Sequence, residues 1–258
     1  MKEPWFPLVM ICTVLLGIWL GIFGPLPKGI TDWINQWQNL IAAVVAVGAA
    51  GLAYHGAMQQ LRQNDRQERN RRSKKHAAVR AMLPLALSQV TEYAQKSEFA
   101  LLALLPQCRG QILPPGSLIQ GLPQILPHET LDVLGELVEY SDDVDVSLVE
   151  TMVAWIQIYD SRVRGLVRDN ADPAGEATVF RLNIENYLID AASIYAAAAA
   201  LFDYGRRRGS RPPDTITWEN VRGAFRNMRM WDEEHRDLYK IVEGREQRSR
   251  GPFDRLVE

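Results

Sequence analysis

The sequence predicts an all-α protein with an N-terminal two-helix transmembrane hairpin, a basic stalk and a cytoplasmic helical bundle. Two long stretches near the start are apolar and carry no charged residue, and a dense basic run follows the second of them. Beyond that run, apolar residues recur at helical intervals in one segment after another. The expected domains are residues 1–58 for the hairpin, 59–80 for the juxtamembrane stalk and 81–258 for the cytoplasmic helical domain.

The first apolar stretch, residues 5–23, is expected to be a membrane span. It differs from a cleaved signal peptide because Lys2 stands beside Glu3 and no Ala-x-Ala cleavage pattern follows. Residues 24–38 are expected to form a short turn, with Trp33 and Trp37 anchored in the headgroup region.

The second span is expected at residues 39–58, where about twenty residues in a helix cover roughly 30 Å and so can cross the hydrocarbon core. Small residues let helix backbones approach closely in lipid, so this span is expected to pack against another helix. A generic Ala-rich span is the alternative. His55 lies near the exit of the span and is a possible pore-lining group. The span-packing residues are Ala42, Ala46, Ala49, Ala50 and Ala53.

The stalk is dominated by positive charge. Basic residues close to a span mark the cytoplasmic side, so the chain is expected to be a multi-pass inner-membrane protein with both termini in the cytoplasm. No large apolar residue occurs between Leu61 and Ala77, which favours a lone solvated or lipid-contacting segment over a coiled coil. Contacts with anionic headgroups are expected from Arg62, Arg66, Arg69, Arg71, Arg72, Lys74 and Lys75.

Charge separates along the chain. Residues 1–80 have a net charge of +6 and residues 81–258 a net charge of −8. A nucleic-acid-binding domain carries positive charge on its folded part, so no nucleic-acid partner is expected. Cys12 and Cys108 are not expected to pair, which fits a reducing compartment.

The cytoplasmic domain is expected to be helical throughout. Pro84 is expected to kink the first helix or end it early, Gly205 to end the fourth, and Thr217 to cap the last. The Ala196–Ala200 run should allow close packing at the centre of the bundle, and no β-hairpin signal is present. The proline-rich stretch 106–127 is expected to pack across the domain or, alternatively, to touch membrane or a partner. The helices are expected at residues 77–105, 129–140, 146–167, 176–204 and from Thr217 to about Gly244.

The helix at 129–140 carries an acidic stripe opposite its apolar face. The stripe is either a solvated surface or a binding site for a basic protein partner, for which the stalk of a second copy is one possibility. Its members are Glu129, Asp132, Glu136 and Glu139.

Enzymatic chemistry is not expected from the motifs present. The four histidines are scattered, so neither a metal site nor a cofactor is predicted, and hydrolase, kinase and dehydrogenase fingerprints do not occur. The spacings Arg69 to His76, Arg71 to His76 and Arg229 to His235 resemble the Arg-x4–6-His motif of HEPN ribonucleases, which are helical proteins that cut RNA at a dimer interface. That resemblance implies an imidazole acting as acid or base and an arginine holding phosphate.

The layout is similar to that of small inner-membrane proteins built from a transmembrane hairpin and a helical cytoplasmic domain, and the Arg- and Ala-rich composition suggests a bacterial source. The function expected first is a self-associating membrane anchor or scaffold. A pore-forming or membrane-perturbing effector gated by the cytoplasmic domain is the alternative, and a HEPN-like ribonuclease is the third possibility.

Overall fold

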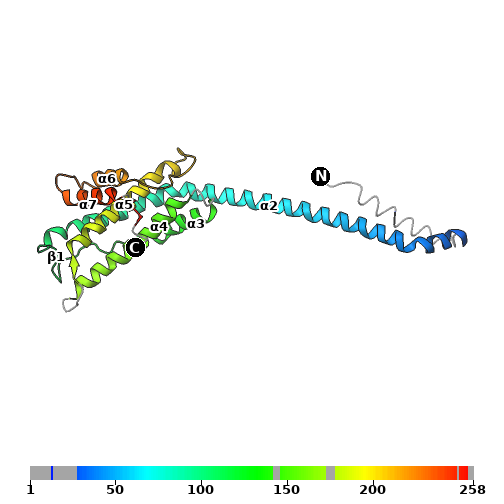
Figure 1. Cartoon of the computed structure of the whole chain (residues 1–258), viewed down its shortest axis with the longest axis horizontal. Coiled ribbons are helices and arrows are strands. Elements are labelled where there is room, and N and C mark those ends of the chain that lie inside the picture. Colours follow the sequence, from blue (N-terminus) through cyan, green and yellow to red (C-terminus); the bar gives the residue numbers. More distant parts are fainter. Residues whose placement is uncertain (1–12, 14–27, 142–145, 173–177, 249, 255–258) are drawn as a thin grey trace. The chain divides into compact units, whose positions relative to one another are not determined.

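The computed structural model describes residues 13, 28–141, 146–172, 178–248 and 250–254, and the chain divides into two compact units, residues 1–68 and 69–258. The described part is mostly helical, as predicted (Figure 1). In the second unit, helices α3 to α7 pack together with the C-terminal part of a long helix, α2. The elements are α2 (Lys28–Leu102), a 3-10 turn (Leu105–Gln107), β1 (Ile112–Leu113), α3 (His128–Tyr140), α4 (Ser147–Ala171), β2 (Val179–Phe180), α5 (Arg181–Gly205), α6 (Trp218–Asn227) and α7 (Arg236–Gln247).

Helix α2 joins residues of four segments that were predicted separately: the turn, the second span, the stalk and the first cytoplasmic helix. The turn predicted over residues 24–38 is wrong from Lys28 onward, because α2 already begins there. Ile30, Trp33, Ile34 and Trp37 recur at three- and four-residue intervals, which is a helical period. The first predicted span, residues 5–23, lies outside the described residues apart from Thr13.

Pro84 lies inside α2 and does not end it. Gly205 at the end of α5 lies against the Pro84 ring: a Cβ on Gly205 would lie 3.3 Å from both Cδ and Cγ of that ring. The absent side chain of Gly205 therefore allows α5 to approach α2 closely.

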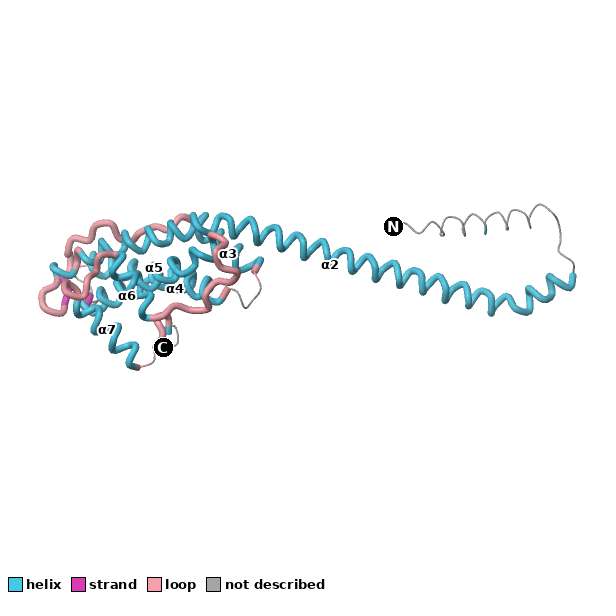
Figure 2. The backbone as a smooth tube through the Cα atoms, turned by 90° about the horizontal axis from the view of Figure 1, so that it is seen from above, coloured by secondary structure: helices cyan, strands magenta, loops and turns pink. Residues whose placement is uncertain are grey.

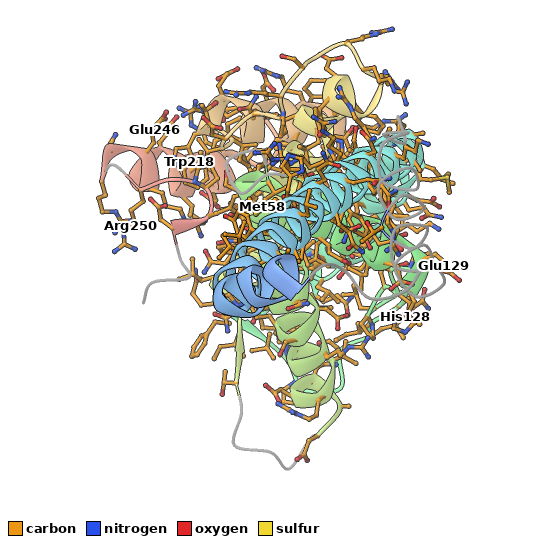
Figure 3. All side chains as sticks on the ribbon, turned by 90° about the vertical axis from the view of Figure 1, so that its right-hand side faces the viewer. Met58, His128, Glu129, Trp218, Glu246 and Arg250 are labelled. Carbon is orange, nitrogen blue, oxygen red and sulfur yellow. The ribbon has the colours of Figure 1, made fainter. Side chains whose placement is uncertain are left out.

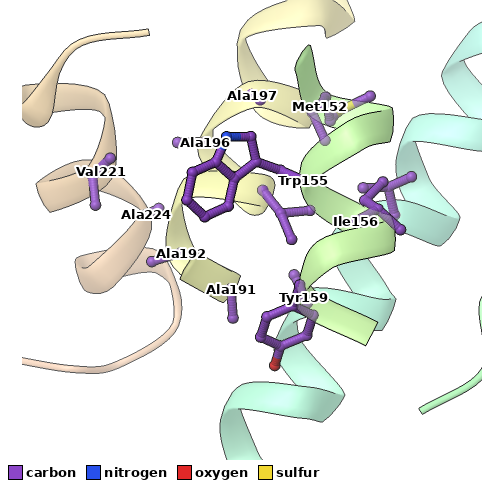
Figure 4. Close-up of a cluster of buried hydrophobic side chains, with 14 of the residues drawn as sticks. Met152, Trp155, Ile156, Tyr159, Ala191, Ala192, Ala196, Ala197, Val221 and Ala224 are labelled. Carbon is purple, nitrogen blue, oxygen red and sulfur yellow. The ribbon is translucent and has the colours of Figure 1, made fainter. Parts of the chain in front are cut away.

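Helix α5 is the centre of the bundle, as the alanine run predicted. Its buried alanines face α4 on one side and α6 on the other, and the large rings of Trp155 and Tyr159 on α4 fill the space beside them (Figure 4). Short side chains let three helices approach one another, and the fully buried rings of Trp155 and Tyr159 fill the space between them. Asp190, which is also buried on α5, pairs with Arg162 on α4 at 2.8 Å.

A two-stranded antiparallel ribbon was not predicted. β1 and β2 pair Ile112 with Phe180 and Leu113 with Val179, and the ribbon lies at one end of the bundle among irregular segments (Figure 2). Leu113 and Val179 are buried while their neighbours in sequence are exposed, so the alternation of two short strands replaces the first turn of the helix predicted at 176–204.

The predicted C-terminal helix is in fact two helices. Thr217 caps α6, as expected, and its hydroxyl accepts a hydrogen bond from the backbone N–H of Asn220. The prediction that this helix continues to Gly244 is wrong, because Arg229 adopts a left-handed conformation with φ of 61°. Met228 and Met230 are both buried, and residues two apart cannot occupy the same face of a continuous helix.

The end of α5, like that of α6, is followed by an arginine in the left-handed conformation. α5 ends at Gly205, as predicted, but the left-handed position of the cap is occupied by Arg207, with φ of 60°. The N–H of Arg208 donates to the carbonyl of Asp203 at 2.8 Å and the N–H of Arg207 donates to the carbonyl of Tyr204 at 3.0 Å. These two bonds make a Schellman cap with arginine where glycine is usual.

Candidate membrane-anchoring site

Residues 42–58 of α2 form the apolar segment, whose valine and leucine side chains are exposed. Val44, Val47 and Leu52 are 66%, 73% and 65% exposed. Among the described residues one helix, α2, is long and apolar enough to cross a membrane, and the qualifying window has none of its residues buried. A core helix of similar composition would be mostly buried, whereas the apolar segment is exposed in the part of the chain that the structure describes.

The small residues of the apolar segment form one face. At 100° per residue, Ala42, Ala46, Ala49 and Ala53 fall within about 60° of one another around the helix axis, and Ala50 stands at its edge. All five are exposed. His55 points about 150° away from the centre of this face.

The stalk after residue 58 is a helical, solvent-exposed continuation of α2. Arg62, Arg66 and Arg69 follow four- and three-residue steps and form a stripe, whereas the later basic residues surround the helix. All seven basic residues predicted to contact headgroups are exposed: Arg62, Arg66, Arg69, Arg71, Arg72, Lys74 and Lys75.

Residues 75–80 of α2 contact α3 and α5 through the side chains of Lys75, His76 and Arg80. The ammonium of Lys75 donates to the hydroxyl of Tyr140 at 2.7 Å, and Nε2 of His76 lies 2.9 Å from the hydroxyl of Tyr204. The guanidinium of Arg80 stacks 4.0 Å from the centroid of the Tyr204 ring, and its Nε donates to the Tyr204 carbonyl at 2.8 Å. Val79 is buried, so the hydrophobic core already begins within the segment assigned to the stalk.

The two Arg–His motifs lie in separate places. Arg69 and Arg71 project into solvent, and the polar contact found for His76 is with Tyr204, at the C-terminal end of α5. Arg229 is the exposed left-handed residue after α6, and His235 is the N-cap residue of α7, near the N-terminal end of α5. The 25 residues of α5 measure about 37 Å, so one chain does not bring the two histidines together.

His235 lines a small charged cavity of about 160 Å³ that also contains Glu185 and Arg181. Nε of Arg181 donates to the buried Glu185 carboxylate at 2.8 Å, and this bond raises the pKa of the Arg181 guanidinium. The Arg181–Glu185 spacing of four residues was a signal in the sequence that was not used. Within the described ranges, no group of three His, Cys, Asp or Glu side chains could hold a metal ion.

The acidic stripe on α3 lies in solvent. Glu129, Asp132, Glu136 and Glu139 are exposed, and Glu129 is at the edge of the domain opposite Trp218 and Glu246 (Figure 3). α3 runs antiparallel to α2, because Thr130 donates a hydrogen bond to Gln89 while Tyr140 accepts one from Lys75.

Three buried polar groups that the sequence analysis did not single out lie between α2, α4 and α5. Glu98 on α2 is 5% exposed, and burial raises the pKa of its carboxyl to about 7. Its charge and that of Asp190 both raise the pKa of the fully buried Tyr159, although burial itself is the main cause. Glu98 follows Ala94 by four residues and precedes Leu101 by three, so its place on the buried face was visible in the sequence.

No protein-family model, curated protein or solved structure matches the chain. The exposed apolar segment, the basic stalk and the contacts at residues 75–80 are the features of this chain that bear on its function.

Proposed function

We propose that this chain is an integral inner-membrane protein that anchors a helical interaction domain in the cytoplasm and associates with further copies of itself. The exposed apolar segment is the observation that carries the proposal. Moving a large aliphatic side chain out of water is favourable by about 1.5–3 kcal/mol, and no charged residue between positions 38 and 58 opposes it. The basic stalk that follows favours a cytoplasmic domain.

Self-association is proposed through the small-residue face. Helices in lipid associate by close packing, which a face of alanines permits. His55 points away from that face, so the same packing directs it toward lipid and gives little support to the alternative of a pore lined by this histidine. The anchor therefore fits the helix geometry better than the pore.

Site-directed labelling tests the span and its orientation. In a chain with Cys12 and Cys108 replaced by serine, Ala49→Cys tests the apolar segment and Ser73→Cys tests the stalk. We expect a membrane-impermeant maleimide to label Ser73→Cys in inverted membrane vesicles but not in intact cells, and to leave Ala49→Cys unlabelled in both. Equal labelling of the two cysteines, or a purified protein that stays dispersed without detergent, would overturn the proposal.

Particle mass in detergent tests self-association. Ala46→Leu together with Ala53→Leu widens the small-residue face, and we expect it to reduce the mass of the oligomer. Gly48→Leu together with Gly51→Leu, both at least about 130° from the centre of the face around the axis, is the matched control and should leave the mass unchanged. If neither variant changes the mass, this face is not the interface.

A further inference from the structure

A second basic surface lies on the folded domain, in the loop after α5. We propose that residues 206–211, the arginine loop, dock the cytoplasmic domain on the anionic phosphate headgroups of the membrane that holds α2. This inference rests on the proposed membrane anchor and extends the lipid contacts from the stalk to the domain itself. The loop contains Arg206, Arg207, Arg208 and Arg211.

The position of the arginine loop is fixed by contacts with α2. Nη2 of Arg80 donates to the carbonyl of Gly209, and Nη2 of Arg207 donates to the carbonyl of Ala77 at 3.4 Å. The stacked Arg80–Tyr204 pair holds the residue just before the loop. Although it is about 130 residues away in sequence, the loop therefore lies beside Ala77 and Arg80, at the end of the basic stalk.

The charge of the loop is opposite in sign to the net charge of its domain. Residues 81–258 have a net charge of −8, yet four of the six loop residues are arginines, and all four are exposed. Asp203 and Asp214 are the acidic residues nearest to the loop in sequence, so positive charge dominates locally. Guanidinium groups bind phosphate oxygens through paired hydrogen bonds. A bilayer surface is the favoured source of phosphate because the stalk that meets the loop leads directly from the apolar segment.

Docking is expected to be a reversible state. Ala77 follows Met58 by 19 residues, and the attraction of a charged surface fades over about 8 Å at physiological salt. The loop therefore reaches the headgroups when the basic stalk lies along the bilayer surface and is out of reach when the stalk stands away from it. Each Lys or Arg near an anionic surface changes binding about fivefold, so lipid charge should control which state is populated.

Energy transfer from the loop to the membrane tests the proposal. The full chain, with Cys12 and Cys108 replaced by serine and Ser210→Cys carrying a donor dye, is inserted into vesicles that contain a headgroup-labelled acceptor lipid. We expect greater transfer in phosphatidylcholine vesicles containing phosphatidylglycerol than in phosphatidylcholine alone. The difference should disappear at about 1 M salt, where screening acts over about 3 Å.

A variant in which three arginines of the loop are replaced by glutamine tests whether their charge causes docking. Replacing Arg206, Arg207 and Arg208 by glutamine should weaken docking about a hundredfold and bring transfer down to the level in phosphatidylcholine. The matched control replaces three basic residues elsewhere on the domain by glutamine, with the same change in net charge, and should keep the lipid dependence. The control residues are Arg109, Arg168 and Lys240.

The outcomes separate the two proposals. A chain that does not float with vesicles of either composition contradicts the membrane anchor itself. If the chain floats with both but transfer does not depend on phosphatidylglycerol, or both triple variants respond alike, only the docking of the loop is overturned. Inorganic phosphate that abolishes transfer more strongly than chloride at equal ionic strength would identify the loop as a site for a soluble anion, which also overturns lipid docking.

Discussion

Glu98 gives a prediction about stability that can be worked out from its surroundings. It lies in the last turns of α2, 5% exposed, and burial raises the pKa of its carboxyl to about 7 from an ordinary value of 4.5. The folded state therefore disfavours the charged carboxylate. Glu98→Gln keeps the shape of the protonated side chain and removes its ability to ionise.

The sign of the pH dependence follows from the direction of the shift. Below the unfolded pKa of 4.5 both states are protonated and Glu98 costs nothing. As the pH rises from 4.5 through about 7, the unfolded state ionises first, so the free energy of unfolding falls, and above that range the loss is complete. A shift from 4.5 to about 7 corresponds to at most about 3 kcal/mol.

Thermal unfolding of the full chain in detergent tests this prediction. Near pH 5 we expect Glu98→Gln and the parent chain to unfold at similar temperatures, and near pH 8 the variant to gain up to about 6–12 °C. Glu92→Gln is the control, because Glu92 lies on the same helix with its side chain 60% exposed. A stability difference between Glu98→Gln and the parent that is the same at both pH values would refute the reasoning.

Three further substitutions test backbone features by the same unfolding measurement. Gly205→Ala should lower the free energy of unfolding by about 1 kcal/mol, because its methyl group would press on the Pro84 ring. Gly223→Ala, whose methyl group would have no atom within 4 Å, should raise it by about 1 kcal/mol. Equal effects of the two substitutions would contradict this reasoning. Arg229→Gly should stabilise by about 1 kcal/mol by relieving the left-handed arginine, and a loss would show that its side chain matters more than its φ. Thr217→Ala should cost about 1 kcal/mol through the lost helix cap, and an unchanged melting temperature would mean that the cap is dispensable.

The regular helices of the domain could be predicted because their signals are local. The apolar period of α3, the cap at Thr217 and the alanine run of α5 depend on neighbouring residues, and each appears in the structure. The ends of elements set by distant contacts could not be predicted. The Pro84 ring packs against Gly205, about 120 residues away, and nothing in the sequence near Pro84 indicates that contact.

The candidate site likewise combines a local sequence pattern with contacts between residues far apart in the sequence. The basic stalk is a local pattern and was predicted, but nothing near Arg206 in sequence indicates that this stretch lies against Ala77 and Arg80. The break after α6 was missed because it depends on burying both Met228 and Met230, which requires knowing what they pack against.

Two alanine-rich helical segments of this chain differ in whether other helices cover their side chains. In α5 the alanines are buried against α4 and α6, and Asp190 is tolerated among them because Arg162 lies 2.8 Å from it. In residues 42–58 of α2 the alanines and valines are exposed, and the segment has no charged residue at all. In a helical bundle, a neighbouring helix can supply a partner for each buried charge. Lipid tails cannot. The absence of charge in the apolar segment and its exposure among the described residues are both what the proposed insertion into lipid would require.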